Sequence, residues 1–274
     1  MHVIRTVADL RTALHLEPNI ALVPTMGNLH AGHLSLVRIA QLHGDLVVTS
    51  IFVNRLQFAP HEDFATYPRT LERDCELLDG VGCDIVFAPA DGEMYPQPQG
   101  CTVHPPAALA DILEGAARPG FFAGVCTVVL KLFNMVQPDT AIFGKKDYQQ
   151  LRVIQNMVRQ LSLPIEIVPA ETVRDPRGLA LSSRNGYLSD SLLPKAAQLQ
   201  AALGSLAAAV RSGRSDWRAL EHASQQSLSA AGWAPDYVAI RRQSDLKEPS
   251  PGDPLVALAA AKLDGTRLID NLEI

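Results

Sequence analysis

Two histidines stand three residues apart, where a short aliphatic run ends and a helical pattern begins. They are His30 and His33, with Gly27 and Gly32 beside them. The first turn of a helix offers free backbone N–H groups and the positive end of the helix dipole, and both favour an anion. Glycine lets the backbone approach a bulky ligand, and imidazole donors suit a phosphate that gains charge during displacement at phosphorus. We therefore predict a phosphate site; a zinc pair or a structural helix cap is the alternative, and zinc lacks an acidic helix partner here.

A second candidate phosphate site lies where another short apolar run, 141–143, gives way to a helical pattern. Its residues are Gly144, Lys145, Lys146 and Asp147. A lysine at this place is a mobile point charge that can follow a triphosphate. Asp147 suits a helix N-cap or an acceptor for a ribose hydroxyl. The alternative interpretation is an ordinary solvated loop.

Two polar segments could complete such a site. Asn54 and Gln57 follow the apolar run 46–53, and their amides can bind a carboxylate, a hydroxyl or an amine without adding charge. The segment 181–184, Leu-Ser-Ser-Arg, follows the turn signal at 175–178. It offers hydroxyls and a cation, although serines in a loop are more commonly turn residues.

The elements that must position these residues follow from hydrophobic patterning. Aliphatic runs alternate with helical patterns, which indicates right-handed βαβ crossovers and a parallel sheet. Ligands of such sheets bind at the carboxyl ends of the strands, where both candidate phosphate segments fall. We predict strands at 20–23, 46–53, 84–88, 141–143 and 165–168, and helices at 34–42, 71–78, 127–136 and 148–161. The proline-rich stretch 89–106 is expected to be a rim loop.

The pattern changes after residue 172. We predict helices at 194–210 and 216–231, followed by strands at 237–240, 255–261 and 267–269. The fold class is therefore α/β, with a larger parallel-sheet domain over 1–172 and a smaller α+β domain over 173–274.

Composition limits the classes of function. The chain has 274 residues with 24 Lys+Arg and 29 Asp+Glu, a formal net charge of −5. This mild acidity argues against a broad nucleic-acid interface. Apolar runs fall short of the ~20 residues that span a bilayer, and no signal peptide is visible. The four cysteines form no C-x-x-C pair, so we expect reduced thiols and a cytoplasmic protein without nucleic-acid or membrane partners.

The string P-T-M-G-N-L-H-A-G-H-L-S-L over 24–36 resembles the nucleotide signature of the pantoate–β-alanine ligase family, within the H-I-G-H nucleotidyltransferase superfamily. Further blocks of the family pattern occur in family order at 50–58, 67–70, 113–120, 144–150, 179–187 and 267–271. The resemblance implies a Rossmann-like nucleotidyltransferase domain and a C-terminal α+β lid domain. It also implies a homodimer formed by the larger domain, for which the Phe52–Val53 region and the helix from Phe121 are candidate contributors.

The resemblance implies two half-reactions. The carboxylate of pantoate attacks the α-phosphate of ATP to give pantoyl adenylate and pyrophosphate, and the amine of β-alanine then displaces AMP. By resemblance, His33, His30 and Lys146 act in adenylation, and Gln57, Gln150 and Asn54 bind substrate. The residues expected to contact ATP are Met26, Gly27, Asn28, Leu29, His30, Ala31, Gly32, His33, Gly144, Lys145, Lys146, Asp147, Val173, Leu181, Ser182, Ser183 and Arg184. Mg²⁺ is expected with ATP, held mainly by phosphate oxygens and water, and the sequence identifies no protein ligand for it.

The chain departs from the family pattern at four positions. Lys145 replaces an acidic residue and is expected to add positive charge near the phosphates. Phe121 and Ala123 stand where the family commonly has His and Arg, and Arg55 stands where it has Pro.

Two other functions are weighed against the ligase. One is another small-molecule nucleotidyltransferase, which would lack the amide side chains of Asn54, Gln57 and Gln150. The other is a non-catalytic nucleotide-binding regulator.

Overall fold

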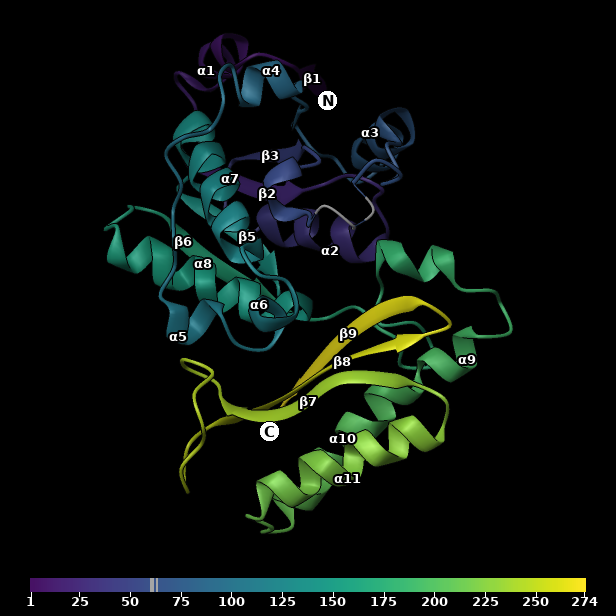
Figure 1. The fold of residues 1–274 in the computed structure, drawn as a ribbon. Coiled ribbons are helices and arrows are strands. Elements are labelled where there is room, and N and C mark those ends of the chain that lie inside the picture. The colour runs from purple at the N-terminus through teal and green to yellow at the C-terminus, as the bar shows by residue number, and fades with distance from the viewer. Residues whose placement is uncertain (60–61, 63) are drawn as a thin grey trace. The chain divides into compact units, whose positions relative to one another are not determined.

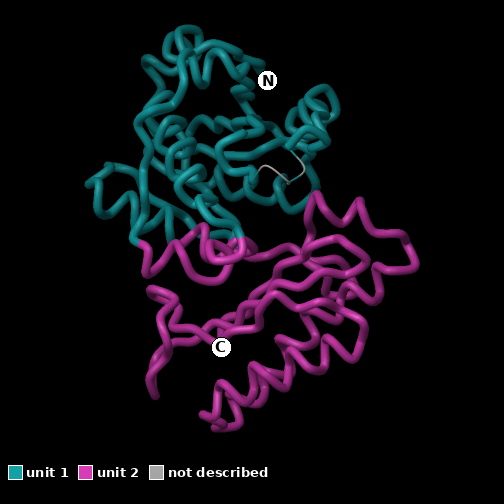
Figure 2. Tube along the Cα trace, in the orientation of Figure 1, with its two compact units in different colours: residues 1–106, 118–144, 153–170 teal, residues 107–117, 145–152, 171–274 magenta. Residues whose placement is uncertain are grey.

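The computed structural model describes residues 1–59, 62 and 64–274, which divide into two compact units (Figure 2). Unit 1 comprises 1–106, 118–144 and 153–170, and unit 2 comprises 107–117, 145–152 and 171–274. Unit 2 thus includes two segments, 107–117 and 145–152, that come from the earlier part of the chain. A single boundary near residue 172 would leave both of these segments in the first domain.

Unit 1 contains a six-stranded parallel sheet with the strand order β1-β4-β3-β2-β5-β6 (Figure 1). The strands are β1 (His2–Ile4), β2 (Ile20–Thr25), β3 (Leu46–Ile51), β4 (Ile85–Phe87), β5 (Thr140–Gly144) and β6 (Glu166–Ala170). The predicted parallel sheet is confirmed. Since β3 and β5 lie on opposite sides of β2, the strand order reverses at β2, which is where ligands of open α/β sheets bind.

Helices connect these parallel strands, as right-handed crossovers require. They are α1 (Val7–Leu14), α2 (Ala31–Ala40), α3 (Leu71–Asp79), α4 (Asp91–Met94), α7 (Phe121–Val136) and α8 (Tyr148–Gln160). The first residues of α8 belong to unit 2. The helix predicted at 127–136 begins earlier, at Phe121, and the predicted rim loop contains the short helix α4. Buried side chains of β2, β3 and α2 form a shared core, so the N-terminus of α2 is fixed relative to the strand ends.

Unit 2 contains an antiparallel sheet in the order β7-β8-β9. Its strands are β7 (Ala234–Arg242), β8 (Leu255–Leu263) and β9 (Thr266–Glu273). Its other elements are α5 (Ala107–Ala110), α6 (Glu114–Ala117), η2 (Lys145–Asp147), η3 (Ser183–Tyr187), α9 (Leu193–Ala196), α10 (Gln198–Arg211) and α11 (Trp217–Ala230). Helices α10 and α11 pack on one face of the sheet in a common hydrophobic core (Figure 1). The predicted smaller α+β domain is therefore present, with longer strands than expected.

All four cysteines lie in described parts of the chain and are free thiols. Burial raises the pKa of Cys83, and it raises the pKa of Cys126 to about 12. Both thiols therefore stay protonated and unreactive at neutral pH. No helix among the described residues is both long enough and apolar enough to cross a membrane.

Candidate active site

A buried carboxylate holds the loop that leads from β2 into α2. Asp74, on α3, is 0% exposed. Its Oδ1 accepts a hydrogen bond from the Leu29 amide at 2.8 Å, and its Oδ2 accepts from the Asn28 amide at 2.9 Å and from Thr70 Oγ1 at 3.1 Å. A Cβ at Gly27, whose φ is +81°, would lie 3.0 Å from Asp74 Oδ2. Glycine is therefore needed both for the backbone conformation and for the close approach of this carboxylate.

The two histidines form a reciprocal cap at the start of α2. His30 is the N-cap residue, and its Nδ1 accepts from the Gly32 amide at 3.1 Å. His33 Nδ1 accepts from the His30 amide at 3.4 Å, and the two ring centroids lie 4.1 Å apart. A neutral imidazole that accepts at Nδ1 carries its proton on Nε2. The structural cap that the sequence left as an alternative is thus present, and it engages the Nδ1 atom of each ring.

The end of β3 places an amide pair beside this loop. Asn54, 1% exposed, caps η1 (Arg55–Gln57). Its Nδ2 donates to Gln57 Oε1 and to the Gly124 carbonyl, each at 3.1 Å. Its Oδ1 accepts from the Leu56 amide at 3.2 Å and from the Tyr95 hydroxyl at 2.7 Å. Asn54 therefore uses both donors and its acceptor inside the protein, and it orients Gln57.

Gln57 links the two strand ends. Its Nε2 lies 2.9 Å from Met26 Sδ, and Thr25 at the end of β2 pairs with Ile51 at the end of β3. Gln57 therefore lies at the same edge of the sheet as the segment that leads to the histidines.

Arg118 fixes Gln57 from a third direction. Its Nη2 donates to the backbone carbonyl of Gln57 at 3.0 Å. Its guanidinium also donates two hydrogen bonds to the Glu62 carboxylate, at 2.6 and 2.7 Å. The Phe121 ring lies under the guanidinium, with its centroid 3.8 Å from Arg118 Cζ. Phe121, a departure from the family pattern, thus supplies a cation–π contact to the residue that holds Gln57.

Helix α7 crosses η1 closely at a glycine. A Cβ at Gly124 would collide with the backbone carbonyl group of Leu56 and would lie 2.8 Å from the backbone nitrogen of Gln57. The close crossing also lets the Gly124 carbonyl accept from Asn54. Gly124 therefore permits the geometry that sets Gln57.

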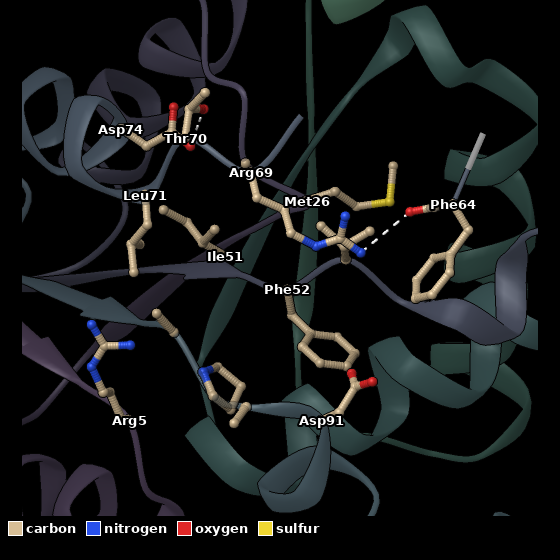
Figure 3. A pocket seen from close by; sticks show the side chains of 15 residues that line it. Arg5, Met26, Ile51, Phe52, Phe64, Arg69, Thr70, Leu71, Asp74 and Asp91 are labelled. Atoms are coloured by element: carbon tan, nitrogen blue, oxygen red, sulfur yellow. Dashed lines mark hydrogen bonds between the residues drawn. The ribbon is translucent and has the colours of Figure 1, made fainter. Parts of the chain in front are cut away.

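A cavity of about 350 Å³ opens at the carboxyl ends of β1 to β4 in unit 1 (Figure 3). Met26 and Gly27 form part of its wall, and Ile51 and Phe52 contribute apolar surface. Figure 3 shows Arg69 extending along the cavity, where its Nη2 donates to the Phe64 carbonyl at 3.2 Å. The cavity is therefore lined by the first residues of the segment that leads from β2 to His30.

In unit 2, side chains of β9, together with Glu171, hold the η2 turn. Asn271 Nδ2 donates to the carbonyls of Lys145 and Lys146 at 2.8 and 2.9 Å. The Lys145 ammonium pairs with Glu171 at 2.6 Å and with Glu273 at 2.8 Å. Burial opposes its charge, but hydrogen bonds to these two carboxylates raise the pKa of Lys145. The positive charge expected near the phosphates at Lys145 is thus neutralised by two acidic side chains.

The segment that precedes the Ser-Ser-Arg motif is a closed turn. Arg174 and Ala180 form an antiparallel bridge, and the Asp175 carboxylate accepts from the amides of Arg177 and Leu179, both at 2.9 Å. Burial opposes ionisation, but these amides lower the pKa of Asp175. The turn is therefore stabilised by a charged acceptor at its centre.

The predicted signature residues of unit 2 converge after this turn. Leu181 donates its amide to the Val173 carbonyl at 2.9 Å, and Ser182 caps η3 by accepting from the Arg184 amide at 3.3 Å. Lys146, Ser182 and Arg184 line one small pocket, and Ser183 opens η3 beside it. Two segments that are distant in sequence are thus brought together as a cationic pocket within unit 2.

Three buried polar residues have roles that the sequence did not indicate. Asp74 holds the histidine loop, and Asn271 holds η2. Gln149 is 3% exposed and donates to the carbonyls of Leu109 and Ile112, both at 2.8 Å. Its neighbour Gln150, predicted to hold pantoate, is half-buried. A signal for Asn271 was present in the block 267–271, which the resemblance marked without giving it a role.

The described residues include no group of three or more His, Cys, Asp or Glu side chains arranged to hold a metal ion. Both oxygens of Asp74 are occupied by amide and hydroxyl donors. Within the described ranges 1–59, 62 and 64–274, the side chains thus form no cluster of three or more acidic, His or Cys ligands that would hold Mg²⁺.

Comparisons with known proteins agree along the whole chain. The family model described as pantoate-beta-alanine ligase matches residues 2–273. A pantothenate synthetase of Leptothrix cholodnii is 58% identical over 285 residues, which cover 100% of both chains. A crystal structure of the Thermus thermophilus pantothenate synthetase has a TM-score of 0.95 at 45% identity, covering 100% of this chain and 99% of the other. The Francisella tularensis pantoate-beta-alanine ligase, in complex with beta-gamma ATP and beta-alanine, has a TM-score of 0.83 at 30% identity, with coverages of 100% and 97%.

Proposed function

The chain belongs to the pantoate-beta-alanine ligase family, and from this premise we propose how its own residues carry out the family's reaction. The enzyme ligates pantoate to β-alanine at the expense of ATP and forms AMP. The Francisella tularensis relative, whose structure holds an ATP analogue and β-alanine, supports both as ligands of this chain.

We propose that the reaction passes through pantoyl adenylate. The carboxylate of pantoate attacks the α-phosphate and releases pyrophosphate, after which the amine of β-alanine attacks the acyl carbon and releases AMP. Neither step needs a protein nucleophile. Catalysis then consists of positioning the reactants and stabilising charge that develops at phosphorus.

The reciprocal cap at the start of α2 is the observation that carries this proposal. It consumes Nδ1 of His30 and of His33, and so it fixes the proton of each ring on Nε2. We assign His33 Nε2–H as the main donor to the phosphate during adenylation, with His30 beside it on the phosphate chain. The rest of the loop, Met26 to Leu29 with Ala31 and Gly32, supplies backbone contacts to ATP.

In unit 2, we assign the pocket lined by Lys146, Ser182 and Arg184 to the charge of the departing pyrophosphate, with Ser183 beside it. Gly144, Asp147, Val173 and Leu181 are proposed as further ATP contacts. The ion pairs of Lys145 with Glu171 and Glu273 support a different role for this residue. We propose that Lys145 anchors the turn and does not bind phosphate.

Pantoate is proposed to bind through the amides of Gln57 and Gln150, and Gln57 also contacts β-alanine. Asn54 is saturated with internal hydrogen bonds. We therefore propose that Asn54 acts on the substrate through Gln57.

Mg²⁺ is proposed to arrive with ATP, coordinated by phosphate oxygens and water, because Mg²⁺ keeps several waters and is held by few protein groups.

We also propose a cytoplasmic homodimer. Phe52 is only 6% exposed and packs within its own chain, so it is removed from the candidate interface residues. Light scattering measures the mass directly.

The function is tested by incubating the protein with ATP, Mg²⁺, pantoate and β-alanine and measuring AMP and pantothenate. AMP and pantothenate should form in equal amounts, and their formation should require both pantoate and β-alanine. Without β-alanine, pantoate-dependent exchange of labelled pyrophosphate into ATP should persist, since only the first step runs. Formation of AMP without pantoate, or no AMP at all, would contradict the proposal.

A further inference from the structure

The last strand of the chain carries a row of polar side chains along one face. Side chains alternate between the two faces of a strand, so Arg267, Asn271 and Glu273 of β9 share one face with Ile269, and these three polar residues are called the polar row. Leu268 and Leu272 lie on the other and join the hydrophobic core with α10. This polar row is unusual for a strand whose neighbour β8 is buried along nearly its whole length.

Each member of the polar row binds one of the two segments that unit 2 takes from the earlier part of the chain. Arg267 makes two hydrogen bonds to Glu114 of the 107–117 segment, both at 2.7 Å. Asn271 binds the carbonyls of the η2 turn. Glu273 accepts from Lys145 at 2.8 Å and from the Tyr148 hydroxyl at 2.9 Å. The row therefore links both 107–117 and 145–152 to the last strand of the unit 2 sheet.

The η2 turn, which joins β5 to α8, has little internal hydrogen bonding of its own. It is three residues long, and a single 3₁₀ turn has few internal hydrogen bonds. Asn271, 7% exposed, uses both hydrogens of its amide on two consecutive carbonyls of this turn. One of those carbonyls belongs to Lys146 itself, so the contact fixes the backbone from which the Lys146 side chain extends.

We propose that Asn271 is a positioning residue for Lys146, and that Glu273 reinforces it by holding Lys145. This inference rests on the proposed role of Lys146 toward the phosphates of ATP. Asn271 touches no substrate and acts only by setting the place of the ammonium group. A displacement of about 1 Å in a positioned group can cost about 100-fold in rate, so loss of these two hydrogen bonds has a measurable catalytic effect.

The test compares Asn271→Ala with the wild type in the two half-reactions separately. The first is pantoate-dependent exchange of pyrophosphate into ATP. The second is pantothenate formation from supplied pantoyl adenylate and β-alanine, in which the pyrophosphate has already left. For Asn271→Ala we expect kcat/KM for ATP in the exchange reaction to fall about tenfold to 100-fold. The second half-reaction should stay within about twofold of the wild type, since the phosphates that Lys146 contacts are absent.

A double-mutant cycle shows whether Asn271 acts through Lys146. If it does, Asn271→Ala combined with Lys146→Ala should be no slower than Lys146→Ala alone, since coupled residues are not additive. Asn271→Leu keeps the approximate volume of the side chain and removes both donors, so it should match Asn271→Ala. Gln225→Ala is the matched control, because its amide also donates to a backbone carbonyl in unit 2, that of Val238 at 3.5 Å, but from α11.

Equal losses in both half-reactions, or additive effects in the cycle, would show a general structural role and overturn the inference. Wild-type exchange kinetics in Asn271→Ala would overturn it as well. Failure of the proposed function is seen separately, as a wild-type protein without exchange activity. In that case the ratio of ATP affinities of wild type and Asn271→Ala, from equilibrium titration, still decides the inference, and equal affinities would overturn it.

Discussion

The rings of His30 and His33 lie with their centroids 4.1 Å apart, and each ring closes one half of the cap on α2. A capping role and a phosphate-binding role are usually alternatives for one polar side chain. Imidazole has two nitrogens at opposite positions on the ring, so Nδ1 can cap the helix while Nε2 presents a proton. The cap thus favours the tautomer that the proposed role of His33 in adenylation needs.

Two substitutions of His33 should separate its nitrogens. Asparagine places an oxygen near the position of Nδ1 and retains the cap, whereas glutamine places an amide nitrogen near the position of Nε2 and retains the donor. We expect the free energy of unfolding of His33→Asn to differ from that of the wild type by less than about 1 kcal/mol, which is the cost of losing a helix cap altogether. Its adenylation rate should nevertheless fall at least about 100-fold, as for loss of one preorganised donor.

His33→Gln should be the less stable variant and the more active one. Urea unfolding and pyrophosphate exchange measure the two properties. Near-wild-type exchange in His33→Asn would show that Nε2 is not the donor.

Gly124→Ala should disturb the proposed pantoate site through η1, although Gly124 is not proposed to contact the substrate. The new methyl group would collide with the Leu56 carbonyl, and overpacking of this kind costs about 1–3 kcal/mol. Relief of the collision moves η1 and with it Gln57, so we expect KM for pantoate to rise about tenfold or more. Steady-state kinetics with varied pantoate and urea unfolding test both effects.

Gly204→Ala is the control for this substitution. Gly204 lies in α10, and nothing lies within 4 Å of a Cβ built there. It should gain up to about 1 kcal/mol from helix propensity and leave KM unchanged. A normal KM for pantoate in Gly124→Ala would contradict the proposed role of Gln57 in binding pantoate.

The sequence predicts local structure well where a periodic pattern is strong. The β-branched run of β3 and the glycine-histidine start of α2 give the sheet edge and the candidate phosphate site without any structure. By contrast, β1 is three residues long and mostly exposed, so it has no apolar pattern to detect. Its pairing with β4 is a long-range contact, which propensity does not encode.

The residues that support the site were harder to predict, for a related reason. Asp74 lies 46 residues from Asn28, and Asn271 lies 126 residues from Lys145. An isolated acid on an amphipathic helix, or an amide beyond the end of a predicted strand, is interpreted as a surface residue until the fold shows that it is buried. Lys145 shows the same effect, since its charge is interpreted correctly only when Glu171 and Glu273 are seen beside it.

Asp74→Asn should loosen the histidine loop. An NH₂ group replaces one of the two carboxylate oxygens and must then face the backbone N–H of Asn28 or of Leu29. Two donors that face each other leave a buried donor unsatisfied, which costs about 1–3 kcal/mol. We expect that loss in the free energy of unfolding together with slower pyrophosphate exchange, because the loop leads directly into His30. Asp79→Asn, at the exposed end of the same helix, should change stability by less than about 0.5 kcal/mol. Unchanged exchange in a destabilised Asp74→Asn would show that the loop is held by other contacts.

The network around Glu273 should make stability depend on pH in the acid range. Burial opposes ionisation, but hydrogen bonds from Lys145 and Tyr148 lower the pKa of Glu273 below its ordinary value of 4.5. A carboxyl whose pKa is lower in the folded protein stabilises it fully above the ordinary value, and this contribution disappears as the pH falls through the folded value. The difference in unfolding free energy between wild type and Glu273→Gln should therefore be largest near pH 6 and should shrink toward pH 3. Urea unfolding at intervals between these limits measures it, with Glu17→Gln, an exposed carboxylate on the other unit, as the control. A difference that stays constant with pH would show that Glu273 acts through its packing and not through its charge.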